Sequence, residues 1–221
     1  MGARIGAVGR RGAVLPAGAW GWLGWTAGLA ALVVAALGVL YGGESGPGEV
    51  DERIGPVVDG VGSPWREAAL AVDALGEPVG AALLVGALVA GLLVLRHPRA
   101  AAFLVVGVGA AVGTATLLKH VVGRTIHGGD NLSYPSGHTA FLTALALVLA
   151  VVTAGPGRGR SAGTLLVPAA AVAAGGVMGW AQVALGAHYP TDALGGWCTA
   201  LAVTPAAGWL VDRAAGRRRR S

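Results

Sequence analysis

Two histidines stand at the starts of two apolar segments, and each has neighbours suited to phosphate chemistry. His188 is followed four residues later by Asp192, which falls in the first turn of the last apolar segment. A carboxylate at this spacing can hold one ring nitrogen of the histidine and raise the basicity of the other. The sequence therefore predicts His188 as a nucleophile that forms a phosphohistidine, with Asp192 orienting it. The alternative is an interfacial histidine beside a helix-capping aspartate.

The second histidine, His138, follows Pro135-Ser136-Gly137 directly before another apolar run. A helix that begins here presents unpaired backbone N–H groups and the positive end of its dipole, both of which bind phosphate oxygens. We expect Ser136 to add a hydroxyl donor and Gly137 to allow the anion to approach closely. His138 would then protonate the leaving group. The alternative is that Ser136 only caps the helix.

Two cations follow the third apolar run, on the same predicted face as both histidines. Lys119 and Arg124 are expected to neutralise phosphate oxygens as charge builds up in the transition state. The alternative is that both side chains extend to the membrane interface from helix ends. We find no cluster of histidine, aspartate and glutamate at metal-ligand spacing, so we expect a reaction with no metal and no cofactor.

Long apolar blocks must position these residues. The 221 residues are 54% hydrophobic and 12% charged, against roughly 25% charged in soluble domains. Asp73, Glu77 and Pro78 interrupt the second block, so its span is expected to begin at about Pro78, with interfacial helices over 50–77. Since a span needs about 20 residues, the sequence predicts an all-α bundle of six transmembrane helices in a single domain over 19–211. The six blocks are 19–41, 67–95, 100–118, 138–154, 162–180 and 191–211.

Arginine placement predicts the orientation. Most basic residues fall in the two tails, 1–18 and 212–221, or in loops on the same face of the bundle. By the positive-inside rule both tails are cytoplasmic, and both histidine clusters face the extracytoplasmic side. The net charge of +5 does not indicate nucleic acid, because the basic residues adjoin apolar blocks. The sequence leaves the oligomeric state open. These arginines are Arg4, Arg10, Arg11, Arg96, Arg99, Arg158, Arg160, Arg213 and Arg217–Arg220.

These motifs resemble the type 2 phosphatidic acid phosphatase superfamily, which includes bacterial lipid phosphatases and vanadium haloperoxidases. Its motifs are Lys-x6-Arg-Pro, then Pro-Ser-Gly-His, then Ser-Arg-x5-His-x3-Asp. The second is complete at 135–138, and the third has its histidine and aspartate at His188 and Asp192. The resemblance implies a phosphatidic acid phosphatase/haloperoxidase-like core. It also implies that His188 is the nucleophile, Asp192 its orienter and His138 the general acid. The phosphate-binding residues it implies are Lys119, Arg124, Ser136, Gly137 and Gln182.

The chain departs from this pattern at two cationic positions. The arginine of the first motif falls on Ile126, and Arg124, two residues earlier, is expected to substitute for it. The Ser-Arg pair of the third motif falls on Ala181 and Gln182, and Gln182 donates hydrogen bonds without a charge. Each lost charge-assisted contact costs about 1.5–3 kcal/mol. Activity is expected nonetheless.

The sequence thus predicts a multi-pass lipid phosphatase of the bacterial cytoplasmic membrane. Undecaprenyl diphosphate is the first expected substrate, followed by phosphatidylglycerophosphate, phosphatidic acid and other polyprenyl phosphates, and vanadate is expected to inhibit. A second hypothesis is an enzyme that ionises or transfers a prenyl diphosphate, with Trp180 stabilising a cation. A third is a non-catalytic lipid-binding membrane protein, which the two departures favour. A haloperoxidase would need a soluble architecture.

Overall fold

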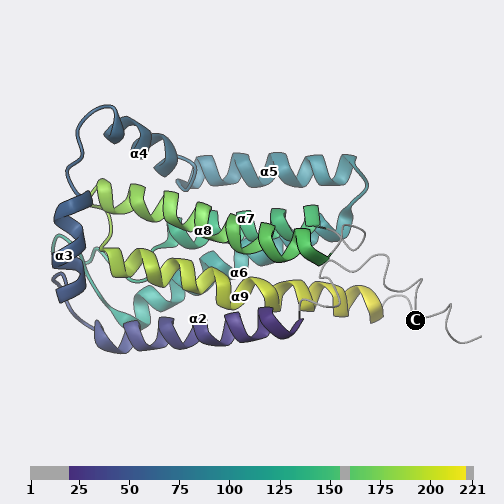
Figure 1. The fold of residues 1–221 in the computed structure, drawn as a ribbon, viewed down its shortest axis with the longest axis horizontal. Helices are drawn as coiled ribbons and strands as arrows, with labels where there is room; N and C mark the ends of the chain where they lie inside the picture. Colours follow the sequence, from purple (N-terminus) through teal and green to yellow (C-terminus); the bar gives the residue numbers. More distant parts are fainter. Residues whose placement is uncertain (1–19, 155–159, 218–221) are drawn as a thin grey trace, which may run out of the picture.

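The computed structural model describes residues 20–154 and 160–217, and these residues form a bundle of helices (Figure 1). Outside the helices, the loop between α6 and α7 contains an isolated β-bridge between Thr125 and Leu132. The long helices run side by side, and α3 lies across one end of the bundle (Figure 1). The helices are α2 (Trp20–Leu40), α3 (Glu49–Val58), α4 (Trp65–Asp73), α5 (Pro78–Val94), α6 (Pro98–Val122), α7 (Gly137–Ala154), α8 (Arg160–Ala184) and α9 (Pro190–Arg217).

Five of these helices, α2, α6, α7, α8 and α9, are long and apolar enough to cross a membrane. A sixth span arises if α4 and α5, which meet at an angle of 63°, are counted as one broken span. Helices suit this setting because they satisfy their own backbone hydrogen bonds where no water is present. The prediction of an all-α, multi-span bundle is confirmed, and the chain is a multi-pass integral membrane protein.

The helix boundaries follow the predicted blocks closely. α5 begins at Pro78 as expected, and the stretch before it contains the short helices α3 and α4. α6 continues to Val122, past the predicted end at 118, so Lys119 lies in its last turn. α9 runs to Arg217, past 211. The N-terminal tail, Arg158 and the last four residues lie outside the described residues, and the membrane orientation stays a prediction.

The centre of the bundle is α7, which packs against α6, α8 and α9. Its inward side chains include Phe141, Ala144 and Val148, which join Phe103 and Leu104 of α6 in one buried apolar cluster. Many residues at these helix contacts are small, which lets backbones approach closely in lipid. α5 lies at the edge of the bundle and has no fully buried residue.

A close contact between α9 and the start of α7 sets the geometry of the histidine end. A Cβ atom at Gly196 would lie 2.2 Å from the carbonyl oxygen of Ser136, so only glycine permits this approach. The backbone N–H of Ser136 donates to the carbonyl oxygen of Asp192 at 2.9 Å. Nearby, the Tyr134 hydroxyl donates to the Val34 carbonyl at 2.8 Å, which ties the same loop to α2. The starts of α7 and α9 therefore meet, although 50 residues separate His138 from His188.

Candidate active site

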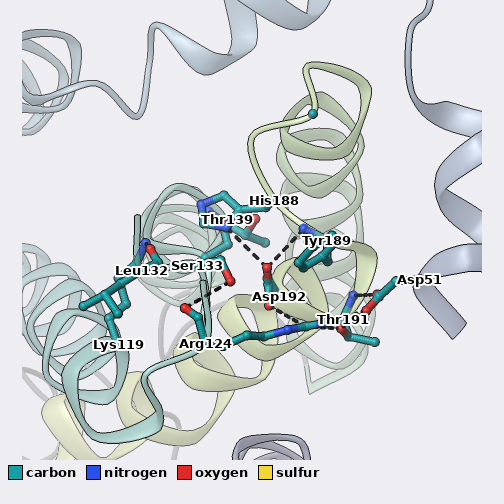
Figure 2. A network of polar contacts seen from close by, with 12 residues as sticks. Asp51, Lys119, Arg124, Leu132, Ser133, Thr139, His188, Tyr189, Thr191 and Asp192 are labelled. Carbon is teal, nitrogen blue, oxygen red and sulfur yellow. Dashed lines mark hydrogen bonds and ion pairs between the residues drawn. The ribbon is translucent and has the colours of Figure 1, made fainter. Parts of the chain in front are cut away.

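His188 and Asp192 lie together at the start of α9 (Figure 2). His188 Nδ1 is 3.7 Å from Asp192 Oδ2, and the two side chains are 9% and 0% exposed. The same carboxylate oxygen accepts a hydrogen bond from the backbone N–H of Tyr189 at 3.1 Å. The turn that joins α8 to α9 thus holds the aspartate below the imidazole, and the structure places the predicted pair together.

The other oxygen of Asp192 belongs to a buried ion network (Figure 2). Asp192 Oδ1 accepts from Arg124 at 2.7 Å. The second terminal nitrogen of Arg124 donates to Asp51 of α3 at 2.6 Å. The Thr191 hydroxyl contacts Arg124 and Asp51: it accepts a hydrogen bond from Arg124 at 2.7 Å and donates one to Asp51 at 2.9 Å. Removing one partner from such a buried, hydrogen-bonded set leaves an uncompensated charge.

The environment of Arg124 differs from the phosphate-binding position expected from the sequence. Its side chain is fully buried and its two terminal nitrogens are engaged by two carboxylates. The rings of Tyr41 and Tyr189 cover the guanidinium at 4.1 and 4.5 Å from its carbon, a cation–π arrangement. The guanidinium therefore contacts Asp192 and Asp51, and its role as a substitute for the missing motif arginine stays untested.

Of the two roles considered for the residues before α7, the structure shows the helix cap, and phosphate binding stays a prediction. The Ser136 hydroxyl accepts from the backbone N–H and the hydroxyl of Thr139 at 3.3 and 3.1 Å, as a helix cap does. Gly137 is the first residue of the helix, and His138 follows in the first turn. His138 Nε2 lies 3.6 Å from Asp73 Oδ1 and 3.5 Å from Glu77 Oε1. The acid expected from the sequence thus faces two carboxylates from the α4–α5 junction.

Lys119 and Gln182 complete the predicted set. Lys119 is half-buried in the last turn of α6, where its ammonium donates to the Leu132 carbonyl at 2.7 Å. Gln182, 1% exposed, donates to Asp73 at 2.6 Å. Ile126, at the place of the motif arginine, is buried. Of the predicted phosphate-binding residues, the positively charged ones are therefore Lys119 and the enclosed Arg124.

The electrostatics favour a neutral His188. Burial lowers the pKa of this histidine below its usual value, and the positive charge of Lys119 and the nearby His138 act in the same direction. The negative charge of the nearby Asp192 carboxylate opposes the shift. A neutral imidazole keeps a lone pair available for attack on an electrophile.

Several residues of this site carry no signal in the sequence. Asp51 and Tyr41 enclose Arg124 from α3 and the end of α2, and Asp73 and Glu77 approach His138 from the α4–α5 junction. They precede the motifs by many residues, and in the sequence they resemble ordinary interfacial polar residues. A polar residue interrupting an apolar block, as Asp73 does, is the one available hint.

A multi-span helical bundle with a buried histidine–aspartate pair at one end defines an integral membrane protein with a polar site at the membrane surface. The chain belongs to the PAP2 superfamily, whose model matches residues 19–215. It is thus a membrane protein of a lipid phosphatase family. No curated protein matches the chain.

A solved structure similar to this fold is described as the first transmembrane PAP2-type phosphatidylglycerolphosphate phosphatase from Bacillus subtilis. The match has a TM-score of 0.69 and 21% sequence identity, and it covers 86% of this chain and 97% of that one. At this identity the likeness shows the shared fold. The resemblance expected from the motifs is therefore confirmed at the level of family and architecture.

Proposed function

We propose that the chain hydrolyses a phosphate monoester or diphosphate of a lipid through a phosphohistidine on His188. The observation that carries the proposal is the arrangement of a buried imidazole 3.7 Å from Asp192, whose second oxygen is held by Arg124. Separations in ligand-free structures commonly shorten when substrate binds. A histidine fixed in this way, near the histidine of a second helix start, suits nucleophilic attack better than simple lipid binding.

The charges around Asp192 support this step. The buried network contains two carboxylates, Asp51 and Asp192, for one guanidinium. Asp192 Oδ2 is the oxygen that faces His188, whereas Oδ1 faces Arg124. As Nε2 bonds to phosphorus, the imidazole ring gains positive charge, and the carboxylate beside Nδ1 stabilises it. The surplus negative charge of the network is thus available where the reaction needs it.

The two half-reactions balance with the residues at hand. In the first, the P–O bond of the lipid breaks as the N–P bond forms, and protonated His138 gives its proton to the leaving oxygen. In the second, a water molecule transfers a proton to His138 and attacks phosphorus. The N–P bond breaks, inorganic phosphate leaves, and both histidines return to their starting states.

We assign phosphate binding to Lys119 and to the backbone N–H groups of the first turn of α7, beginning at Gly137, because the N–H of Ser136 already donates to the Asp192 carbonyl. Arg124 is assigned to holding Asp192, because its terminal nitrogens already contact carboxylates. Gln182 takes the place of a cation and instead orients Asp73. This pocket carries less positive charge than the family pattern, so weaker phosphate binding is part of the proposal.

The proposed substrates are lipid phosphates whose headgroups reach this end of the bundle on the extracytoplasmic side. Undecaprenyl diphosphate is the first candidate. Phosphatidylglycerophosphate follows, supported by the description of the Bacillus subtilis structure, and then phosphatidic acid and other polyprenyl phosphates. The bilayer supplies such substrates by lateral diffusion, so the site requires no large soluble domain.

The test is phosphate release by the full chain in detergent from these lipids, with farnesyl diphosphate included as a short prenyl substrate. His188→Ala is the catalytic control, and thermal unfolding verifies that this variant is folded. Release that disappears in His188→Ala supports the proposal and ranks the substrates. Release that persists in the folded variant contradicts the nucleophile assignment, and no release from any of these lipids contradicts hydrolysis.

A second candidate function is non-hydrolytic, and the replacement of both motif arginines by Ile126 and Gln182 favours it. The chain would then bind a lipid phosphate, or ionise or transfer a prenyl diphosphate. Trp180, considered as a cation-stabilising group, packs edge-on against Trp65 with ring centroids 6.3 Å apart. Product analysis separates these functions. A prenyl alcohol or monophosphate as product indicates hydrolysis, and a cyclic hydrocarbon indicates ionisation. Recovery of the unchanged lipid indicates that the chain only binds it.

A further inference from the structure

A second polar cluster surrounds His138 and shares no residue with the ion network. Asp73 ends α4 and Glu77 precedes α5, four residues later, at the junction where the two helices meet at 63°. Both carboxylates point at the same nitrogen, because His138 Nε2 lies 3.6 Å from Asp73 Oδ1 and 3.5 Å from Glu77 Oε1. One oxygen of each acid and one nitrogen of the histidine all lie within 4.8 Å of one another.

These separations match the ligand shell of a transition metal. Zinc bonds to nitrogen and carboxylate oxygen are about 2.0–2.2 Å long, and tetrahedral angles then place neighbouring ligand atoms about 3.4 Å apart. The two separations measured at His138 Nε2 are within 0.1–0.2 Å of roughly that value. One imidazole and two carboxylates, with water as the fourth ligand, form a donor set that zinc accepts.

Two further observations support a bound cation at this cluster. His138 Nε2 is buried, yet it has no hydrogen-bond partner among the described residues. Buried polar atoms are seldom left in this state without a function. In addition, the buried amide of Gln182 donates to Asp73 at 2.6 Å, and such outer hydrogen bonds typically orient carboxylate ligands of metals.

The junction also holds the imidazole against the two acids. A Cβ atom at Gly76 would lie 2.3 Å from His138 Cδ2, so the glycine lets the α4–α5 turn pack directly on the ring. The three donors therefore come from a turn and a helix start that are packed together. They are already close to one another before an ion binds, unlike acidic side chains spread over a surface.

We propose that Asp73, Glu77 and His138 form a binding site for a transition-metal cation, with Zn²⁺ as its best occupant, and that occupancy inhibits the enzyme. The inhibitory part rests on the proposed function, in which His138 carries the proton for the leaving group. The binding part stands on the geometry alone. Mg²⁺ is a poor occupant, because it prefers octahedral oxygen ligands and dehydrates reluctantly.

Inhibition follows from the use of one nitrogen for two purposes. The Nε2 lone pair that binds Zn²⁺ is the pair that would otherwise carry the proton, so zinc binding to a protonated His138 releases one proton to solvent. The loaded site has no proton to give to the leaving oxygen. The cation needs no change of oxidation state, and chelation restores the free histidine.

The binding test uses the full chain, purified in detergent without a polyhistidine tag and treated with EDTA. Isothermal titration and metal analysis after dialysis should show one zinc ion per chain and no comparable Mg²⁺ binding. Glu77→Gln should weaken zinc binding roughly tenfold or more, because it removes a first ligand. Glu67→Gln is the matched control. It also removes one negative charge, but from an exposed side chain of α4 that accepts a hydrogen bond from the Ser63 hydroxyl. This variant should bind zinc as the wild type does.

Equal zinc affinities in Glu77→Gln and the wild type would overturn the site, and so would an absence of stoichiometric zinc in the wild type. Thermal unfolding of both variants verifies that the comparison is between folded proteins. The activity arm then adds Zn²⁺, Mg²⁺ or EDTA to the phosphate-release assay. We expect zinc to lower phosphate release by the wild type and by Glu67→Gln. The Glu77→Gln variant should need roughly tenfold more zinc for the same inhibition. EDTA should leave phosphate release unchanged.

The two arms separate failure of this inference from failure of the proposed function. Stoichiometric zinc without loss of phosphate release contradicts the inhibitory part and supports the binding part. No phosphate release from any lipid overturns the proposed function, and the titration still decides the metal site. Zinc inhibition of equal strength in Glu77→Gln places the inhibitory ion elsewhere and contradicts the proposal.

Discussion

The two sides of the histidine end differ in how completely their polar groups are satisfied. On one side, the Arg124 network joins α3, the α6–α7 loop and α9 through short contacts. Both terminal nitrogens of its guanidinium are bonded, and Nε alone of the three has no hydrogen-bond partner among the described residues. On the other side, His188 Nδ1 and His138 Nε2 are buried and lack hydrogen-bond partners among the described residues. We call the first side closed, because its charged groups are paired with one another, and the second side open, because its two histidines each have an unpaired nitrogen.

This difference separates positioning from reaction. A buried network of paired charges resists rearrangement, because any change leaves a charge uncompensated. Unsatisfied nitrogens cost stability in the free protein. Binding recovers that cost when a cation binds His138 Nε2, or when the contact between His188 Nδ1 and Asp192 shortens as substrate binds. We therefore expect substitutions on the closed side to lower stability together with activity, and substitutions on the open side to lower activity with little change in stability.

The largest expected effect lies on the open side, at His188. Replacing the proposed nucleophile by alanine should lower kcat by about 10⁴-fold or more, since the covalent route is lost. Thermal unfolding in detergent should stay close to wild type, because His188 makes no side-chain hydrogen bond that the protein would lose. A large fall in Tm in this variant would contradict the division between the two sides.

The next largest effect is expected for Arg124→Met on the closed side. Removing the guanidinium leaves Asp51 and Asp192 as two buried carboxylates without their cation. The expected loss is about 3–5 kcal/mol of unfolding free energy, or a fall in Tm of roughly 6–20 °C for a chain of this size. Thermal unfolding of the purified protein measures it.

Arg124→Lys is the control for this substitution. It keeps one positive charge but loses the planar fork that reaches both carboxylates, so its Tm should lie between those of the wild type and Arg124→Met. If Arg124 instead bound phosphate, either variant would raise KM and leave Tm unchanged. That outcome would restore the role first expected from the sequence.

The sequence predicts the spans and the paired histidines well, because both depend on local patterns. Apolar blocks of about 20 residues are typical of transmembrane helices, and the start of α5 at Pro78 follows from the preference of proline for the first position of a helix. His188 lies four residues before Asp192, in the short turn that leads into α9, so their proximity follows from spacing. The contact between the starts of α7 and α9 was expected from the common face on which they lie.

Other parts of the site depend on contacts between distant segments and could not be predicted. Asp51 reaches Arg124 across 73 residues of sequence, and no spacing rule connects them. Likewise, the bend between α4 and α5 brings Glu77 to His138, although the sequence showed only an interrupted apolar block. The position of Arg124 two residues before Ile126 suggested a substitute arginine, whereas tertiary packing gives its side chain two carboxylate partners.

A smaller effect is expected for Gln182→Arg, which tests whether the open side lacks positive charge. The new guanidinium should lower KM for a lipid phosphate by about 3–10-fold, less than a full charge-assisted contact provides. Asp73, which Gln182 now contacts at 2.6 Å, would share the new charge. Combining the change with Asp73→Asn should lower KM further. A KM unchanged in both proteins would show that this position does not contact the phosphate.

The smallest expected effect is a shift in the pH dependence of the reaction. Burial, Lys119 and His138 lower the pKa of His188 from its usual 6.5. Because the nucleophile must be neutral, kcat/KM should stay high as the pH falls through 6.5 and decline only below it, where the imidazole becomes protonated. A phosphorus NMR titration of the substrate in the same micelles separates the ionisation of the substrate from that of the enzyme. An acidic limb centred above 6.5 that the substrate does not account for would show that the open side stabilises a charged His188. Asp192 would then outweigh burial, and the division between a closed and an open side would have to be redrawn at that residue.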